Sequence, residues 1–141
     1  MEAGRTTDGA RPKILVVEDN GPLRRLILRI LEGCGYSVVE AASGEQGLER
    51  FREQASSLDL AIVDMVMPGL SGLDVAAEME RQRPGMNILY ISGHASSVAM
   101  ESIGRRSPDR VLIKPFDAGD LIDRVTRLLS PDTPAPSPVT P

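Results

Sequence analysis

Five short apolar runs limit most strongly how this chain can fold, because a segment with helical periodicity follows each of them. The runs are KILVV at 13–17, YSVVEA at 36–41, LDLAIV at 58–63, NILYI at 87–91 and RVLI at 110–113. Short apolar runs rich in β-branched residues are typical of buried strands. Strands that alternate with helices predict a parallel sheet with helices on both faces. The sequence therefore predicts a doubly wound α/β fold, although the alternation alone leaves the strand order open.

The segments between these runs carry helix signals. The expected helices cover about 22–33, 43–54, 71–82, 95–103 and 117–129. In the first of them, apolar residues recur at the spacing of one helix face. Ser43 followed by Gln46 has the pattern of a capping box, and Asp117 is expected to cap the last helix.

Polar side chains stand at the carboxyl ends of four of the apolar runs. Glu18 and Asp19 follow the first run, Asp64 the third, Ser92 the fourth and Lys114 the fifth. Because the carboxyl ends of parallel strands lie at one edge of the sheet, we expect these side chains to surround a single crevice. Three neighbouring carboxylates repel one another unless a cation lies among them.

This set of groups fits Mg²⁺-assisted phosphoryl transfer onto a carboxylate. Mg²⁺ prefers oxygen ligands and shares its coordination shell among a few carboxylates, water and phosphate oxygens. A lysine can balance the charge of a phosphoryl group, and an aspartate can be the nucleophile that forms an acyl phosphate. Asp64 is the central candidate. The alternative, that Asp64 merely ends a strand at the surface, is disfavoured by the other polar groups expected at the same edge.

Four motifs, ILVVEDN, AIVDMVMPGLSG, ISG and KPF, make residues 13–129 resemble the receiver domain of bacterial two-component response regulators of the chemotaxis-regulator type. Each motif alone is weak, but their order and spacing together are specific. The resemblance implies a flavodoxin-like sheet of five parallel strands in the order 2-1-3-4-5. It also implies a signalling domain that assists its own phosphorylation and dephosphorylation, rather than an enzyme acting on separate substrates.

The resemblance implies roles for the acidic residues and for one backbone group. Asp64 would accept a phosphoryl group from a histidine kinase or a histidine phosphotransfer protein. Mg²⁺ would be held by Glu18, Asp19, Asp64 and the backbone carbonyl of Val66. Asp19 would be a direct ligand, and Glu18 would act through water.

The remaining motif residues would act on the phosphoryl group or report its presence. Ser92 would supply a switch hydroxyl, Lys114 would pair with the phosphoryl oxygens, and Gly93 would leave room for them. The bond from Lys114 to Pro115 is often cis in this family. Receivers commonly carry Tyr or Phe three residues before the lysine, whereas this chain has Val111, which puts the usual aromatic switch in doubt.

Composition bears on the cellular setting. The chain has 141 residues, which suit one domain. Its net charge of -4 gives no overall positive potential for nucleic acid, and its single cysteine fits a reducing compartment. No apolar stretch approaches the roughly 20 residues that span a bilayer. We therefore expect a cytoplasmic protein that binds neither nucleic acid nor membranes. Arg24, Arg25 and Arg29 are interpreted as a solvated helix face.

The domain boundaries and the output are further expectations. Residues 1–12 are expected to be disordered, 13–130 to form the receiver domain, and 131–141 to form a proline-rich tail or linker. The domain could control a downstream protein as a monomer or phosphorylation-dependent dimer, serve as a phosphorelay shuttle, or belong to a hybrid histidine kinase. A pseudo-receiver scaffold and an aspartate-nucleophile phosphatase are the disfavoured alternatives, the latter because Val66 stands where such enzymes have a second aspartate. For His94, the only histidine, tuning of phosphate hydrolysis and simple solvation stay equally open.

Overall fold

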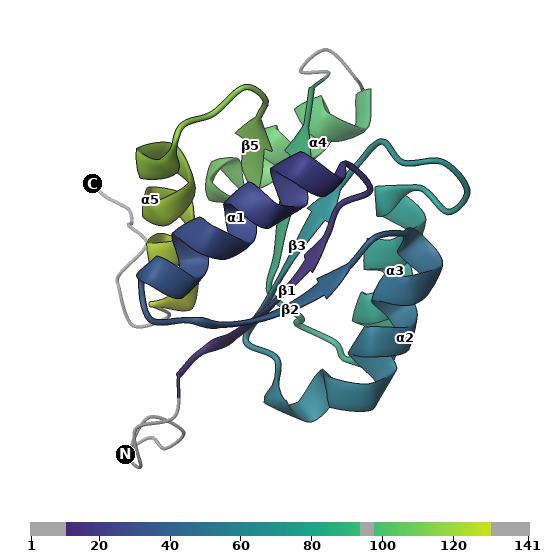
Figure 1. Ribbon diagram of the computed structural model, residues 1–141. Coiled ribbons are helices and arrows are strands. Elements are labelled where there is room, and N and C mark those ends of the chain that lie inside the picture. The colour runs from purple at the N-terminus through teal and green to yellow at the C-terminus, as the bar shows by residue number, and fades with distance from the viewer. Residues whose placement is uncertain (1–10, 94–97, 131–141) are drawn as a thin grey trace.

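The computed structural model describes residues 11–93 and 98–130, which form a parallel sheet with helices on both faces (Figure 1). The strands are β1 (Lys13–Val17), β2 (Ser37–Ala41), β3 (Leu60–Asp64), β4 (Ile88–Ser92) and β5 (Val111–Ile113). The helices are α1 (Gly21–Gly33), α2 (Gly44–Gln54), α3 (Gly72–Gln82), α4 (Val98–Arg106) and α5 (Ala118–Leu129), with short 3₁₀ helices at Ala55–Ser57 and Pro108–Arg110. The strand order is β2-β1-β3-β4-β5. The predicted fold class and strand order are confirmed.

The register of the sheet aligns the carboxyl ends of its strands. Val17 at the end of β1 pairs with Val63 near the end of β3, and Asp64 pairs with Ile91 on β4. Ser92 pairs with Ile113 on β5. Asp64 and Ser92 are thus the last residues of their strands, whereas the sequence pattern predicted strands that end one residue earlier. They belong to the strands because the ladder continues through them.

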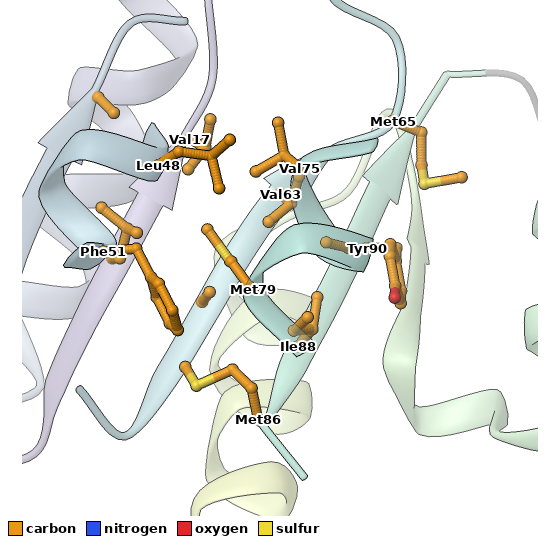
Figure 2. Packing of buried hydrophobic residues seen from close by; sticks show 14 of the residues in the cluster. Val17, Leu48, Phe51, Val63, Met65, Val75, Met79, Met86, Ile88 and Tyr90 are labelled. Carbon is orange, nitrogen blue, oxygen red and sulfur yellow. The ribbon is translucent and has the colours of Figure 1, made fainter. Parts of the chain in front are cut away.

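Two apolar clusters cover the two faces of the sheet, because successive residues of a strand point to opposite faces. Figure 2 shows the cluster beneath α2 and α3, where Phe51 and Met79 pack against the strands. The other cluster joins the sheet to α1 and α5 through fully buried Ile27 and Leu121. Strands buried on both faces need continuous apolar runs, which explains the pattern of the sequence.

Four of the described helices, α1, α2, α3 and α5, have a side-chain cap at their first turn. At α3, the Ser71 hydroxyl accepts a hydrogen bond from the Asp74 amide at 3.2 Å. Asn20 Oδ1 accepts a hydrogen bond from the Leu23 amide at 2.9 Å, and Asp117 and Asp120 form a reciprocal capping box at α5. At α2, Ser43 accepts from the Gln46 amide, but the Gln46 side chain accepts from the Ala42 amide instead of that of Ser43. The capping box predicted there is therefore only half formed. The second contact goes to the residue that precedes the cap.

Helix α4 ends at Arg106, beyond the expected end at Ile103. It continues through Gly104, and the Ser107 amide still donates to the Ile103 carbonyl at 2.7 Å, so the backbone hydrogen bonds run on despite the low helix propensity of glycine. The expected start of this helix at Ala95, as well as His94, lies outside the described residues. Most of the expected segment 1–12 and all of 131–141 lie outside them too, and these boundaries stay predictions. Within the described ranges, no helix has the length and apolar character needed to cross a bilayer.

Candidate functional site

Three carboxylates meet at the carboxyl edge of the sheet. Glu18 and Asp19 follow β1, and Asp64 ends β3, the neighbouring strand. Each of the three offers an oxygen atom, and these atoms all lie within 4.8 Å of one another. Glu18 and Asp64 are buried, with exposed fractions of 0% and 2%, while Asp19 is exposed. The crevice expected from the sequence is thus an acidic site with one side open to solvent.

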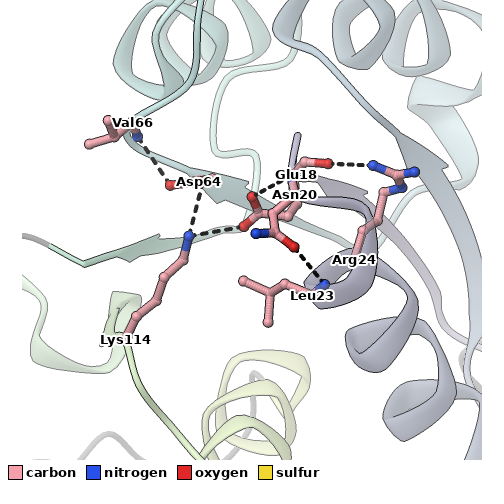
Figure 3. A network of polar contacts seen from close by, with 7 residues as sticks. All are labelled: Glu18, Asn20, Leu23, Arg24, Asp64, Val66 and Lys114. Carbon is pink, nitrogen blue, oxygen red and sulfur yellow. Dashed lines mark hydrogen bonds and ion pairs between the residues drawn. The ribbon is translucent and has the colours of Figure 1, made fainter.

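Lys114 reaches into this site from the end of β5 (Figure 3). Its Nζ donates a hydrogen bond to Asp64 Oδ2 at 3.1 Å and lies 3.2 Å from Glu18 Oε1. Burial disfavours the ammonium, but the negative charges of Asp64 and Glu18 outweigh it, and the pKa of Lys114 lies above its ordinary value. A positive charge is therefore held between the two buried carboxylates.

Glu18 is the most unusual of the acids because its carboxylate is wholly buried. Its Oε2 accepts a hydrogen bond from the Asn20 amide at 3.0 Å, whereas its Oε1 accepts none from the described residues and has only the ion-pair contact with Lys114. Burial is the main reason that the pKa of Glu18 rises from 4.5 to about 7, and the nearby Asp64 raises it further against the opposing effects of Asn20 and Lys114.

The raised pKa of Glu18 predicts a pH dependence of stability in metal-free buffer. Between pH 4.5 and about 7, Glu18 holds its proton in the folded state more tightly than in the unfolded state. The free energy of unfolding should therefore fall as the pH rises through this window, by at most about 1.4 kcal/mol per pH unit from this one group. Urea denaturation at a series of pH values measures the slope.

Glu18→Gln is the matched comparison for this pH dependence, since glutamine is similar in shape and does not titrate. The variant should lose the downward slope between pH 5 and 7 and should be more stable than the wild type at pH 8 without metal. Saturating Mg²⁺ should flatten the wild-type slope, because a cation favours the charged carboxylates. Equal slopes in the two proteins would rule out Glu18 as the source.

The remaining predicted residues lie around the same edge. The Val66 amide donates a hydrogen bond to Asp64 Oδ1 at 3.1 Å, and the residue is 56% exposed. Ser92 is fully buried, and its carbonyl accepts a hydrogen bond from the Lys114 amide at 2.7 Å. The bond between Lys114 and Pro115 is cis, as expected. A Cβ built on exposed Gly93 would meet no described atom within 4 Å, so none of the described residues closes this corner of the site.

The donor set fits a hard divalent cation. All of its side-chain donors are carboxylate oxygens, and one of them, Glu18 Oε1, accepts no hydrogen bond from the described part of the chain. A site with two or three carboxylates and an open side suits Mg²⁺, which keeps several waters and shares phosphate oxygens. The acidic cluster can therefore hold a metal ion of this kind.

Val111 replaces the expected aromatic residue, and an aromatic side chain lies on the strand beside it. Val111 pairs in register with Tyr90 on β4. Tyr90 is 9% exposed and belongs to the apolar cluster beneath α2 and α3 (Figure 2). Burial is the main cause that raises the pKa of its phenol. The tyrosine of this region is thus carried by β4 rather than by β5.

Two residues near the site had been missed or misjudged from the sequence. Arg24 is not part of a solvated face, because its side chain is only 15% exposed and is bound to Glu18 and Glu40, whereas Arg25 and Arg29 are exposed. The i, i+4 pattern of α1 could not separate these arginines, because the partners of Arg24 come from the ends of two strands.

Gly72, the last residue of the motif AIVDMVMPGLSG, is the second of these residues, since its contact with the backbone of Asp64 was not predicted. A Cβ at this position would lie 2.1 Å from the carbonyl oxygen of Asp64 and 2.6 Å from the Cα of Met65. The start of α3 therefore packs directly on the backbone of the central acid. The only sequence signal was a glycine in the loop after the strand, which is also common in ordinary turns.

Comparisons with known proteins agree with this geometry. The response regulator receiver domain family matches residues 14–126. The response regulator receiver protein CpdR of Brucella abortus is 31% identical over 117 residues, which cover 83% of this chain and 96% of that protein. The sensor kinase CckA of the same organism is 31% identical over 116 residues, covering 82% of this chain but 12% of the kinase.

Solved structures show the same relationship. The crystal structure of a response regulator receiver domain protein from Clostridium thermocellum has a TM-score of 0.75 at 31% identity, covering 85% of this chain and 95% of that one. The receiver domain of the hybrid histidine kinase CckA has a TM-score of 0.69 at 32% identity, covering 83% and 98%. The match of sequence, fold and acidic edge identifies the chain as a member of the response regulator receiver domain family of two-component systems.

Proposed function

We propose that this receiver domain accepts a phosphoryl group on Asp64 from the phosphohistidine of a histidine kinase or histidine phosphotransfer protein, with the help of Mg²⁺. A carboxylate oxygen of Asp64 forms the new bond to phosphorus as the bond between phosphorus and the histidine nitrogen breaks. The imidazole leaves with the electron pair and takes up a proton. The domain thereby assists its own phosphorylation, and later the hydrolysis of the acyl phosphate on Asp64, without turning over a separate substrate.

The observation that carries this proposal is the contact of Lys114 with the carboxylates of Asp64 and Glu18, at 3.1 Å and 3.2 Å, beside the open acidic cluster. A half-buried ammonium next to the acceptor can pair with phosphoryl oxygens once they arrive. Phosphoryl transfer depends mainly on positioning and charge neutralisation. Lys114 supplies both from the protein itself.

The other residues have complementary roles in the proposal. Glu18, Asp19, Asp64 and the Val66 carbonyl would hold Mg²⁺, which would neutralise the charge of the incoming phosphoryl oxygens. Asp19 is the exposed member and is suited to direct coordination, while the buried Glu18 is suited to contact through water. The Ser92 hydroxyl would donate a hydrogen bond to the phosphoryl group.

The new contacts of the phosphoryl group with Ser92 and Lys114 would favour one conformation of the strand ends, and a partner protein would recognise that conformation. We place the domain in the cytoplasm, as a monomer or a phosphorylation-dependent dimer without nucleic-acid contact. Because one similar protein is a sensor kinase and another structure is the receiver of a hybrid histidine kinase, the domain could also work inside such a kinase or as a phosphorelay shuttle.

Incubation with a small phosphodonor such as acetyl phosphate tests the proposal. We expect a hydroxylamine-sensitive phosphate on the protein in the presence of Mg²⁺ and none with a chelator. Absence of label despite measurable Mg²⁺ binding would contradict the proposal. Absence of both would favour a scaffold, and steady turnover of a phosphate monoester would favour a phosphatase.

A further inference from the structure

Arg24 lies in the first turns of α1, and its side chain joins three parts of the chain. Its Nη1 donates a hydrogen bond to the backbone carbonyl of Glu18 at 2.8 Å (Figure 3). Its Nε donates to Glu40 Oε1 at 2.9 Å. Glu40 belongs to β2, so the guanidinium connects the helix, the acidic loop and the neighbouring strand.

The contact with the Glu18 carbonyl acts on the peptide group that links Glu18 to Asp19. This group is planar, so holding its oxygen also limits where the Cα of Asp19 can lie. The Glu18 amide donates to the Ala41 carbonyl at 3.1 Å, and the Asn20 amide donates to the Glu18 carboxylate at 3.0 Å. Between those two bonds, and within the described part of the chain, the Arg24 side chain donates to the backbone of this loop.

We propose that Arg24 is a positioning residue for the metal site: anchored by Glu40, its guanidinium holds the peptide between Glu18 and Asp19 so that both carboxylates face the cation. This inference rests on the proposed function in one respect, namely that the cation is Mg²⁺. Arginine suits the role because its planar group can donate to two acceptors in a fixed geometry, which the ammonium of lysine does not do.

The sign of the effect separates positioning from simple electrostatics. Arg24 carries a positive charge close to a cation site, and by Coulomb repulsion alone its removal would tighten Mg²⁺ binding. If Arg24 positions the ligands, its removal weakens Mg²⁺ binding despite the loss of that repulsion. The two explanations therefore predict opposite changes in the dissociation constant.

Isothermal titration with Mg²⁺ alone, without phosphodonor, measures this change. Arg24→Ala should raise the dissociation constant about tenfold, the scale seen when groups that orient metal ligands are removed. Arg25→Ala is the matched control, because Arg25 is exposed and next to Arg24 in the chain. It removes the same charge and should leave the constant within about twofold. Arg24→Lys should lie between Arg24→Ala and the wild type.

Hydrogen exchange of the Asn20 amide in metal-free protein gives a second readout that does not depend on Mg²⁺. This amide should exchange about tenfold faster in Arg24→Ala than in the wild type or in Arg25→Ala, while core amides such as that of Val63 stay unchanged. If Arg24→Ala proves unfolded, Arg24→Lys carries the same comparison, since it keeps the aliphatic stem.

The outcomes keep this inference apart from the proposed function. Tighter or unchanged Mg²⁺ binding by Arg24→Ala, or an unchanged Asn20 exchange rate, overturns the positioning role. A wild type that binds no Mg²⁺ overturns the proposed function instead. The exchange rate of the Asn20 amide then shows by itself whether Arg24 holds the backbone of this loop. A weaker affinity together with faster exchange, both absent in Arg25→Ala, supports the role.

Discussion

Replacement of Asp64 by asparagine is expected to abolish phosphorylation by a small phosphodonor, lowering the label about a hundredfold or more to the level seen with a chelator. Asparagine has nearly the same shape but lacks the nucleophilic carboxylate that forms the acyl phosphate. Mg²⁺ affinity should fall as well, because one of three clustered carboxylates is lost. Quantitative mass spectrometry of the intact protein, before and after hydroxylamine, measures the label.

The variant should stay folded, because the asparagine oxygen can still accept from the Val66 amide, and the loss of repulsion with buried Glu18 offsets the lost ion pair with Lys114. Its free energy of unfolding in metal-free buffer should therefore not fall at pH 8. Asp74→Asn is the matched control: Asp74 is an exposed aspartate in the first turn of α3, and its loss should leave the label unchanged. Equal labelling of Asp64→Asn and the wild type would show that another residue accepts the phosphate.

Replacement of Gly72 by alanine is expected to lower the free energy of unfolding by about 3 kcal/mol or more. The added methyl group would lie 2.1 Å from the Asp64 carbonyl oxygen and 2.6 Å from the Met65 Cα, and both are backbone atoms that cannot rotate away. The Gly72 amide also donates to the Met65 carbonyl at 3.2 Å, so the start of α3 and the end of β3 must separate together. Urea denaturation monitored by circular dichroism measures the loss.

Gly33→Ala is the control for the general effect of replacing a helical glycine. Gly33 is exposed in the last turn of α1, and no described atom lies within 4 Å of a Cβ built there. Alanine should be neutral or stabilise the protein by about 0.5–1 kcal/mol at this position. If Gly72→Ala matches Gly33→Ala in stability, the close packing of α3 on the backbone of Asp64 is not tight in solution. The residual folded Gly72→Ala protein should also take label more slowly, because the displaced backbone is that of the acceptor.

The sequence was sufficient for the architecture because its signals are local. Apolar runs, helical periodicity and caps such as Asp117 each depend on neighbours in the chain, and the alternation of elements leaves few topologies. Element ends were less certain: β3 and β4 take in Asp64 and Ser92, and α4 runs through Gly104 to Arg106. For the two strands, pairing with the neighbouring strand, rather than local propensity, decides where the element stops.

In the candidate site too, some features could be predicted from the sequence and others could not. The convergence of Glu18, Asp19, Asp64 and Lys114 follows from the sequence alone, because parallel strands with polar residues at their carboxyl ends must bring those residues to one edge. Their individual environments do not follow from it. Glu18 and Asp19 are adjacent in the chain, yet one is wholly buried and the other exposed.

Tertiary structure alone decided which residues contact the backbone of the acidic residues. Arg24 and Arg25 are the same residue type on one helix, but only Arg24 faces the strand ends where a carbonyl and Glu40 can accept its hydrogen bonds. Position 72 leaves no room for a side chain only because α3 starts against the backbone of Asp64. The chain by itself determined which groups meet, since strand direction and period are local properties. Burial, charge pairing and close backbone contact depend on distances between segments far apart in the chain, and only the packed fold sets those distances.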